Sequence, residues 1–347
     1  MRYVPILKSK PAELKALQDL APEIKSQILP FIDLLPPQKD ELADAWLEKV
    51  TTNLARSWPA ELPLIVDGGS IAAARTSTGE AALLKLWHLC QAQGVGFTPV
   101  TSPSRLEAHQ AAIQGIVRDR ACGGLCLRLS GSDFDYDFPA SPLTDLLRFL
   151  RVKETDADLL LDFGALSAGP VALLMRAYIE SIPNLMAWRS VTVSSTAFPR
   201  DLSHFSPDSV NRVPRTDWKA WRSLCSRPLK RSPDFSDYAI QHPDLIDFDP
   251  KVMTMSAGLR YAAEEHWVIV KGRGLKKHKA ATQMHKLCAK LVALPEYKGP
   301  DFSIGDKWIK DCAESRATHG NSMVWRRMGT GHHLTLTAHQ VANVGVP

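Results

Sequence analysis

The sequence predicts a (β/α)8 barrel of the TIM type, and three observations support this prediction. Seven short apolar runs alternate with longer amphipathic runs between residues 3 and 195. Such alternation is typical of parallel strands joined by helical crossovers. No glycine-rich phosphate loop follows the first strand, which argues against an open doubly wound sheet. The length of 347 residues suits one barrel with additional segments.

Hydrophobic periodicity places each element. The predicted strands are Tyr3–Lys8, Ile28–Leu34, Pro63–Asp67, Val95–Thr101, Gly123–Leu129, Leu159–Phe163, Ser190–Ser195 and, as the eighth, Tyr238–His242. The predicted helices are Pro11–Gln27, Glu41–Arg56, Glu80–Ala92, Ser104–Arg118, Pro142–Arg151 and Pro170–Ser181. Two long connections, Ser130–Ser141 and Phe198–Arg215, are expected to be loops of the kind that form lids or binding elements.

The pattern changes after the eighth predicted strand. Gly258–Glu264 and His266–Lys271 are expected to form a β-hairpin, inserted at residues 256–274 between that strand and its helix. Helices are expected over Ala280–Leu294, near Asp306–Ser315 and from about His332. We therefore expect residues 1–347 to form a single barrel domain, with residues 300–347 as a C-terminal extension packed on the barrel.

Composition indicates a soluble globular chain. Hydrophobic residues make up 45% and charged residues 23% of the sequence, and no run approaches the length of a membrane helix. The N-terminus enters the first strand without a secretory signal, so a cytoplasmic location without a membrane partner is expected. The net charge of +5 falls short of a nucleic-acid signature, and the one dense basic stretch is Lys271–Lys279.

Short segments with distinctive residues occur in order along nearly the whole chain. They are Tyr3-Val4-Pro5-Ile6-Leu7-Lys8 followed by Glu13, Ile28-Leu29-Pro30-Phe31-Ile32-Asp33, Leu160-Leu161-Asp162-Phe163, Ser194-Ser195-Thr196-Ala197-Phe198-Pro199, Leu259-Arg260-Tyr261 with Trp267, Lys271-Gly272-Arg273, Ser303-Ile304-Gly305-Asp306, Trp325-Arg326 and Gly331-His332-His333-Leu334. As an ordered set, these segments resemble the beta protein family, which is named for a bacteriophage protein.

The resemblance implies a cellular context and supplies no mechanism. Members of the family occur in phages and in bacterial gene neighbourhoods of a mobile or defence character. The resemblance therefore implies a cytosolic protein of a phage or anti-phage system, with a protein partner encoded nearby. Lys271 stands where relatives more often carry arginine, so a role that needs a bidentate guanidinium there is called into question.

Polar residues near the ends of the predicted strands should converge over the barrel, because barrel active sites lie at that end. The residues at this C-terminal rim include Thr101 and Ser102 and two sets of candidates. The candidate catalytic residues are Asp162, Asp33, Asp67 and Lys8. The candidate ligand-binding residues are Lys10, Arg128, Ser195, His242, Lys271 and Arg273.

This set of residues suits chemistry on a phosphate-bearing ligand, such as a nucleotide or nucleic acid. The three aspartates could hold a divalent cation such as Mg²⁺, while Lys8, Lys10 and Arg128 receive phosphate oxygens. The expected reaction, if the protein is an enzyme, is phosphoester hydrolysis by a metal-activated water. The alternative is that these residues form ion pairs that close the top of the barrel.

Three further interpretations stay open. The barrel could be a non-catalytic interaction or sensor module, with a protein partner docking at Trp218, Trp221 and the hairpin. It could bind nucleic acid through Lys271–Lys279, with affinity that falls steeply as salt rises. The adjacent His332 and His333 could belong to a metal site, but neighbouring residues on a helix point in different directions, so packing within the helix is the simpler interpretation.

Overall fold

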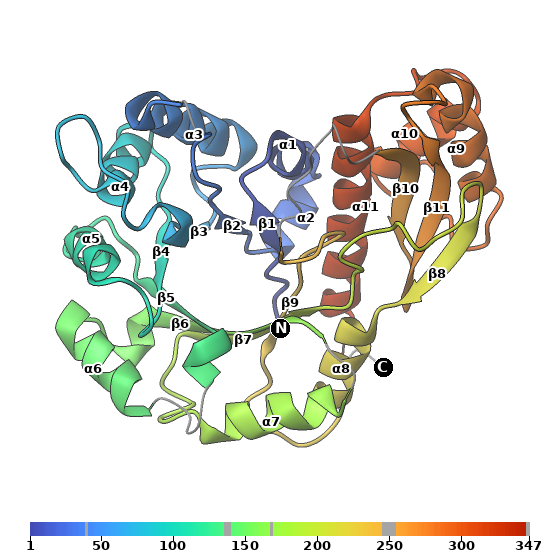
Figure 1. Ribbon diagram of the computed structural model, residues 1–347. Coiled ribbons are helices and arrows are strands. Elements are labelled where there is room, and N and C mark those ends of the chain that lie inside the picture. The colour runs from blue at the N-terminus through green and yellow to red at the C-terminus, as the bar shows by residue number, and fades with distance from the viewer. Residues whose placement is uncertain (39–40, 135–139, 167–168, 245–254, 345–347) are drawn as a thin grey trace.

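Eight parallel strands form a nearly closed barrel in the computed structural model (Figure 1), which describes residues 1–38, 41–134, 140–166, 169–244 and 255–344. The strands in spatial order are β1 (Ile6–Lys8), β2 (Phe31–Asp33), β3 (Ile65–Asp67), β4 (Thr98–Thr101), β5 (Leu125–Ser130), β6 (Ala157–Ala165), β7 (Ser190–Thr196) and β9 (Asp234–Ser236). Tyr3 bridges Phe235 in parallel, which brings the two edges of the sheet together. The barrel prediction is confirmed.

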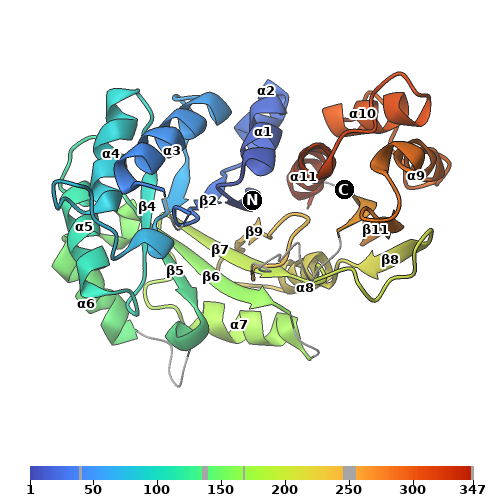
Figure 2. The ribbon, with the colours of Figure 1, turned by 45° about the horizontal axis from the view of Figure 1, so that its top comes forward.

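Helices surround the barrel, as Figure 2 shows from a second direction. They are α1 (Pro11–Asp19), α2 (Pro22–Gln27), α3 (Ala43–Ser57), α4 (Ala82–Ala92), α5 (Glu107–Val117), α6 (Ala140–Leu150), α7 (Val171–Ser181) and α8 (Thr216–Cys225). The single helix expected over Pro11–Gln27 is divided in two. Leu20 and Ala21 are extended, with ψ of 142° and 147°, because Pro22 cannot donate a helical hydrogen bond and disfavours helical backbone before it.

Alternation along the strands separates the core from the barrel interior. In β5, Leu125, Leu127 and Leu129 pack against the helices in the main core. The residues between them, Cys126 and Arg128, therefore face the interior. Apolar side chains fill the lower interior, where Ile6, Phe31 and Ile65 belong to one buried cluster with Cys126. Polar side chains gather above them, at the C-terminal ends of the strands.

The eighth strand lies earlier than predicted. β9 is Asp234–Ser236, and the predicted Tyr238–His242 forms the turn that follows it. The longer apolar run was misleading, because the three-residue β9 contains a single strongly apolar residue. In β9 that residue is Phe235, whose ring lies 5.1 Å from that of Trp218 and 5.2 Å from that of Trp221.

A three-stranded sheet, with helices packed on it, stands beside the barrel (Figures 1 and 2). β10 (Ser256–Ala262) and β11 (His266–Gly274) pair antiparallel where the hairpin was expected. β8 (Val210–Pro214) pairs with β11, so the segment expected to be a loop, Phe198–Arg215, contains a strand. Helices α9 (Met284–Val292) and α10 (Ile304–Ala313) share an apolar cluster with this sheet.

Helix α11 (Ser322–Ala342) lies between the barrel and this sheet (Figure 1). It starts well before His332, because Asn321 caps its first turn by accepting hydrogen bonds from the Met323 and Val324 N–H groups. Gly329 permits the close approach of α11 to β10, since a Cβ there would lie 2.7 Å from the Arg260 carbonyl oxygen. Among the described residues, no helix combines the length and apolar character that a membrane span requires.

The adjacent histidines of α11 contact different parts of the molecule. His332 lies between the Asp306 carboxylate, at 2.7 Å, and the Ala262 carbonyl oxygen, at 2.8 Å. Nε2 of His333 lies 2.8 Å from the carboxylate of Asp237, just after β9. Both side chains are fully buried, so this pair packs α11 against the sheet on one side and the barrel on the other.

Asp217, at the start of α8, gives a prediction about pH. Its carboxylate is buried without a hydrogen-bond partner of ordinary geometry in the described part of the chain, and burial raises its pKa to about 7. An unfolded aspartate has a pKa of about 3.9, so between these values the folded state binds more protons and stability falls as pH rises.

Asp217→Asn is therefore expected to raise the free energy of unfolding by about 1–3 kcal/mol at pH 8 and by less at pH 5, since each pKa unit is worth about 1.4 kcal/mol. Urea unfolding at both pH values would measure the difference. Asp301→Asn, at an exposed position, is the control. A loss of stability at pH 8 would contradict the prediction.

Candidate functional site

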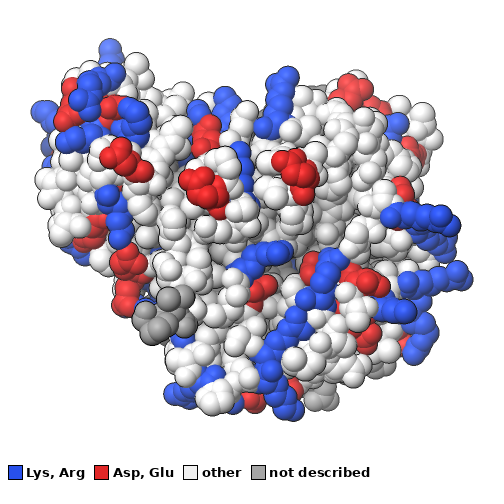
Figure 3. All heavy atoms as spheres, turned by 180° about the vertical axis from the view of Figure 1, so that it is seen from behind, with Lys and Arg blue, Asp and Glu red and all other residues white. Residues whose placement is uncertain are grey.

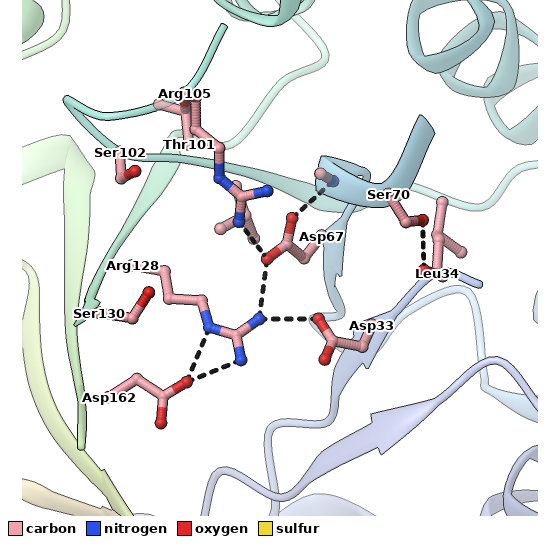
Figure 4. Close-up of polar contacts among 12 residues, drawn as sticks. Asp33, Leu34, Asp67, Ser70, Thr101, Ser102, Arg105, Arg128, Ser130 and Asp162 are labelled. Carbon is pink, nitrogen blue, oxygen red and sulfur yellow. Dashed lines mark hydrogen bonds and ion pairs between the residues drawn. The ribbon is translucent and has the colours of Figure 1, made fainter. Parts of the chain in front are cut away.

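The guanidinium of Arg128 is the centre of the polar layer at the C-terminal rim (Figure 4). Its Nη1 donates to Oδ1 of Asp33 at 2.7 Å and to Oδ2 of Asp67 at 2.9 Å. Its Nε and Nη2 donate to Oδ2 of Asp162 at 2.9 and 2.7 Å. The three predicted catalytic carboxylates therefore converge on Arg128, which was predicted to bind a ligand.

Further polar groups complete this network. Lys8 Nζ donates to Oδ2 of Asp33 at 2.6 Å, and Arg105 Nη2 donates to Oδ2 of Asp67 at 2.8 Å. The Tyr238 hydroxyl donates to Oδ2 of Asp162 at 2.5 Å and accepts from Arg128 Nη2 at 2.9 Å. We call Lys8, Asp33, Asp67, Arg105, Arg128, Asp162 and Tyr238 the rim network.

Charge is balanced within the rim network. Lys8, Arg105 and Arg128 match Asp33, Asp67 and Asp162 one for one. Burial alone would raise the pKa of Asp67, but the guanidinium groups of Arg105 and Arg128 outweigh burial and hold this pKa below its usual value. Burial disfavours the charged form of Arg128 in the same way, and the aspartates outweigh it and raise its pKa well above normal. The network is therefore stable as ion pairs.

The three aspartates do not fit a divalent cation. Their oxygens point at the Arg128 guanidinium, which occupies the position that a shared metal ion would need (Figure 4). Within the described ranges, no group of three or more His, Cys, Asp or Glu side chains is placed to hold a metal ion. The arrangement corresponds to the alternative interpretation, in which ion pairs close the top of the barrel.

A second group of charges lies where the β1–α1 turn, β10 and α11 meet. Nη1 of Arg326 donates to Oε1 of Gln241 at 2.9 Å, and Nη1 of Arg260 donates to the Ile240 carbonyl oxygen at 3.0 Å. Lys10, at the start of α1, interacts electrostatically with both arginines. We call Lys10, Arg260 and Arg326, together with Glu13, the seam cluster.

Cations outnumber carboxylates in the seam cluster. Glu13 is fully buried, and its Oε2 accepts a hydrogen bond from the Lys8 N–H at 2.6 Å. Burial raises the pKa of Glu13, although Gln241 and Arg326 oppose this. Burial and the charge of Arg326 lower the pKa of Lys10, and the same two effects lower that of Arg260 to about 9. The cations therefore destabilise one another here.

The other predicted ligand-binding residues lie outside the rim network. Ser195 faces the helices, because it alternates along β7 with the inward-facing Ser194. His242 lies beyond the true eighth strand, with Nδ1 3.7 Å from Oδ2 of Asp244. Lys271 Nζ donates to the Leu202 carbonyl oxygen at 2.7 Å, and Arg273 pairs with Asp208 at 2.5 Å.

The expectation that Trp218 and Trp221 form an exposed surface patch is wrong. Trp218 and Trp221 are 3% and 1% exposed and stack on each other with ring centroids 5.3 Å apart. The segment Lys276–Lys279 forms the turn after β11 and is largely exposed. On the face seen in Figure 3, basic and acidic side chains are interspersed, so that face presents no uniformly positive surface. Residues 135–139 of the predicted loop Ser130–Ser141 lie outside the described residues.

Sequence reasoning missed Arg260, Arg326, Arg105, Tyr238 and the role of Glu13. Arg260 carried a usable signal, since it is a charged residue between apolar neighbours in a predicted strand. Arg326 carried none, because the start of α11 was placed too late. Both arginines fall within the segments that suggested the family.

Comparison with known proteins identifies the family. A family model described as "Beta protein" matches residues 3–339, nearly the whole chain. The chain belongs to the Beta protein family. For this Beta protein family member, a search of curated proteins found no match.

Solved structures resemble this member of the Beta protein family only weakly. The 4-hydroxy-tetrahydrodipicolinate synthase of Methylacidiphilum fumariolicum SolV has 12% identity and a TM-score of 0.36, over 68% of this chain and 67% of that one. SacUVDE has 10% identity and a TM-score of 0.33, over 70% and 94%. Tryptophan synthase of M. tuberculosis has 11% identity and a TM-score of 0.28, over 69% and 82%. The barrel assignment rests on the strand order.

Proposed function

We propose that this protein binds a phosphate-bearing ligand at the seam cluster, beside the C-terminal rim of the barrel. One observation carries the proposal. Lys10, Arg260 and Arg326 come from three distant segments and meet at half-buried positions, and none of them forms an ion pair with a carboxylate among the described residues. Cations held together and partly removed from water are costly unless an anion pairs with them.

Phosphate suits these side chains. Each guanidinium presents a planar fork of N–H donors that matches two phosphate oxygens, and the ammonium group of Lys10 adds a point charge. Arg326 and Arg260 each use one nitrogen on Gln241 or Ile240, so further donors of both guanidinium groups remain to face a ligand. The protein contacts also hold each arginine in position before binding, which reduces the entropy that binding costs.

The rim network supports this site without supplying a hydrolytic step. Lys8 contributes its side chain to the network and its backbone N–H to Glu13, so it joins the two groups of charges. Asp33, Asp67 and Asp162 serve as positioning residues in this proposal. Ligand binding of this kind suits a sensor in a cytoplasmic phage or anti-phage system, where a protein encoded nearby would respond to the bound state.

Arg260→Gln tests the proposal. Calorimetric titration of the intact protein with inorganic phosphate, a nucleoside 5′-monophosphate and a short single-stranded oligonucleotide would be compared with the variant at low ionic strength. We expect the variant to lose affinity for inorganic phosphate and the nucleotide by roughly ten- to hundred-fold, because a hydrogen bond to a charged group contributes about 1.5–3 kcal/mol.

Arg56→Gln, at an exposed position on α3, is the matched control and should bind as the wild type does. Unfolding midpoints of both variants would show that each is folded. Absence of binding to the wild type, or equal binding by Arg260→Gln, would overturn the proposal. Binding of the oligonucleotide alone would instead favour the Lys271–Lys279 interpretation.

A further inference from the structure

The charges around the seam cluster do not cancel. Lys10, Arg260 and Arg326 contribute three positive charges, and Glu13 contributes one negative charge when it is ionised. The cluster then has an excess of two positive charges. Because these side chains are half-buried and Glu13 is fully buried, water screens this excess less than it would at an open surface.

Neighbouring groups cannot neutralise the excess. The rim network is balanced in itself, with three cations and three aspartates. Lys271 interacts with Arg260, but Asp201 lies near Lys271 and offsets its charge. Arg200 faces Asp244 at 4.0 Å, so this pair also adds no net charge. Within the described ranges, the excess of two therefore remains with the seam cluster.

We infer that the group bound at the seam cluster is the dianion of a phosphate monoester, such as the terminal phosphate of a nucleotide or a phosphorylated sugar. This inference rests on the proposed function and makes it more specific. A dianion cancels the two positive charges, whereas a phosphodiester is a monoanion and leaves one cation without a partner. The internal phosphates of a nucleic-acid backbone are diesters, so the site should favour a terminal phosphate over a continuous strand.

Glu13 is the residue that sets this preference. Its Oε2 is held by the Lys8 N–H, and its Oε1 is buried without a hydrogen-bond partner of ordinary geometry among the described residues. The carboxylate therefore stays beside the cations and limits their excess to two. Glu13→Gln keeps an oxygen for the Lys8 N–H and raises the excess to three. This substitution should shift the preference toward more highly charged ligands, such as inorganic pyrophosphate.

The test compares two probes that differ by one ionisable oxygen. The intact protein would be titrated calorimetrically with methyl phosphate, a monoester, and with dimethyl phosphate, a diester, at pH 8. We expect methyl phosphate to bind roughly ten- to hundred-fold more tightly, because it makes at least one more hydrogen bond between charged groups. We also expect Glu13→Gln to increase the affinity for pyrophosphate relative to methyl phosphate.

Repeating both titrations at pH 5.5 distinguishes the effect of protonating the ligand from the effect of protonating the protein. The second pKa of a monoester is about 6, so methyl phosphate becomes a monoanion and its advantage should shrink. The charged groups facing the site are Lys8, Lys10 and Glu13 from the β1–α1 turn, Arg260 and Lys271 from the sheet, Arg326 from α11 and Asp201 after β7. Protonation of Glu13 would strengthen binding of both probes, and dimethyl phosphate, which does not titrate, would report that effect alone.

The outcomes distinguish the two levels of the proposal. Equal affinities for the two probes, or tighter binding of dimethyl phosphate, would overturn the monoester inference and leave anion binding at the seam cluster intact. Absence of binding to either probe and to inorganic phosphate would overturn the proposed function itself. An unchanged ratio between pyrophosphate and methyl phosphate in a folded Glu13→Gln variant would overturn the role assigned to Glu13.

Discussion

Replacing Arg128 with glutamine is expected to lower the free energy of unfolding by about 3–5 kcal/mol at pH 7, because removing one partner of a buried ion pair leaves an uncompensated charge. Without the Arg128 guanidinium, three aspartates lose a positively charged partner, and Asp67 and Asp162 are only 3% and 4% exposed. Denaturant unfolding would measure the change. Arg56→Gln on the surface of α3 is the control and should change stability by no more than about 0.5 kcal/mol.

The Arg128 variant should also respond differently to pH. The folded pKa of Asp67 lies below its unfolded value of about 3.9, so this carboxylate contributes stability that is present above about pH 4 and lost as pH falls through the folded pKa. Without Arg128 much of that contribution is absent. The difference in the free energy of unfolding between wild type and the Arg128 variant should therefore become smaller as the pH falls below about 4. A loss below about 1 kcal/mol at pH 7 would show that the rim network is not held as buried ion pairs.

Asp306→Asn is also expected to be damaging and to lower the free energy of unfolding by about 2–3 kcal/mol, because buried hydrogen bonds to a carboxylate are lost. The Asp306 carboxylate accepts hydrogen bonds from the Tyr261 hydroxyl at 2.8 Å, the Ser303 hydroxyl at 2.5 Å and Nδ1 of His332 at 2.7 Å. The other ring nitrogen of His332 lies 2.8 Å from the Ala262 carbonyl oxygen, so the ring is held on both sides. An asparagine at position 306 has one side-chain oxygen in place of two, so buried groups that now donate to the carboxylate lose their acceptor.

Asp306→Asn should also weaken phosphate binding at the seam cluster. Asp306 connects α10 to α11 through His332, and α11 carries Arg326 beside the Arg260 of β10. Denaturant unfolding would measure stability, and phosphate titration would report the site. Asp301→Asn, at an exposed position before α10, is the control. Stability within about 1 kcal/mol of wild type would mean that this buried network does not hold α11 in place.

Much of the barrel could be read from the sequence, because periodicity reports directly which residues a strand or helix buries. The predicted strands Tyr3–Lys8, Ile28–Leu34 and Pro63–Asp67 contain β1, β2 and β3, in which Lys8, Asp33 and Asp67 lie side by side in register. Parallel strands place their C-terminal ends at one rim, so the convergence of these residues followed from their positions in the chain. The resemblance to the Beta protein family was likewise present in the order of short segments.

Short strands that depend on distant partners could not be read in this way. β8 has few apolar residues and forms a strand because β11 offers it an edge. β9 is identified as a strand by its pairing with β7 and its bridge to Tyr3. Neither β8 nor β9 has a periodic pattern of apolar residues that would identify it as a strand from its own sequence. The assignment of α11 failed for a related reason, since its central residues are buried on nearly all sides and show little amphipathic contrast.

The barrel, the family and most of the charged residues at the rim could be predicted from the sequence, because they follow from local periodicity, strand direction and the order of short segments. The partners of those charges are set by the tertiary structure. Arg128 lies at the centre of the barrel mouth, where it pairs with three aspartates from three strands. Lys10 meets Arg260 and Arg326 across a seam, although these arginines lie 250 and 316 residues further along the chain. Ion pairing depends on distances of a few ångströms between such segments, and those distances are set by packing of the whole chain.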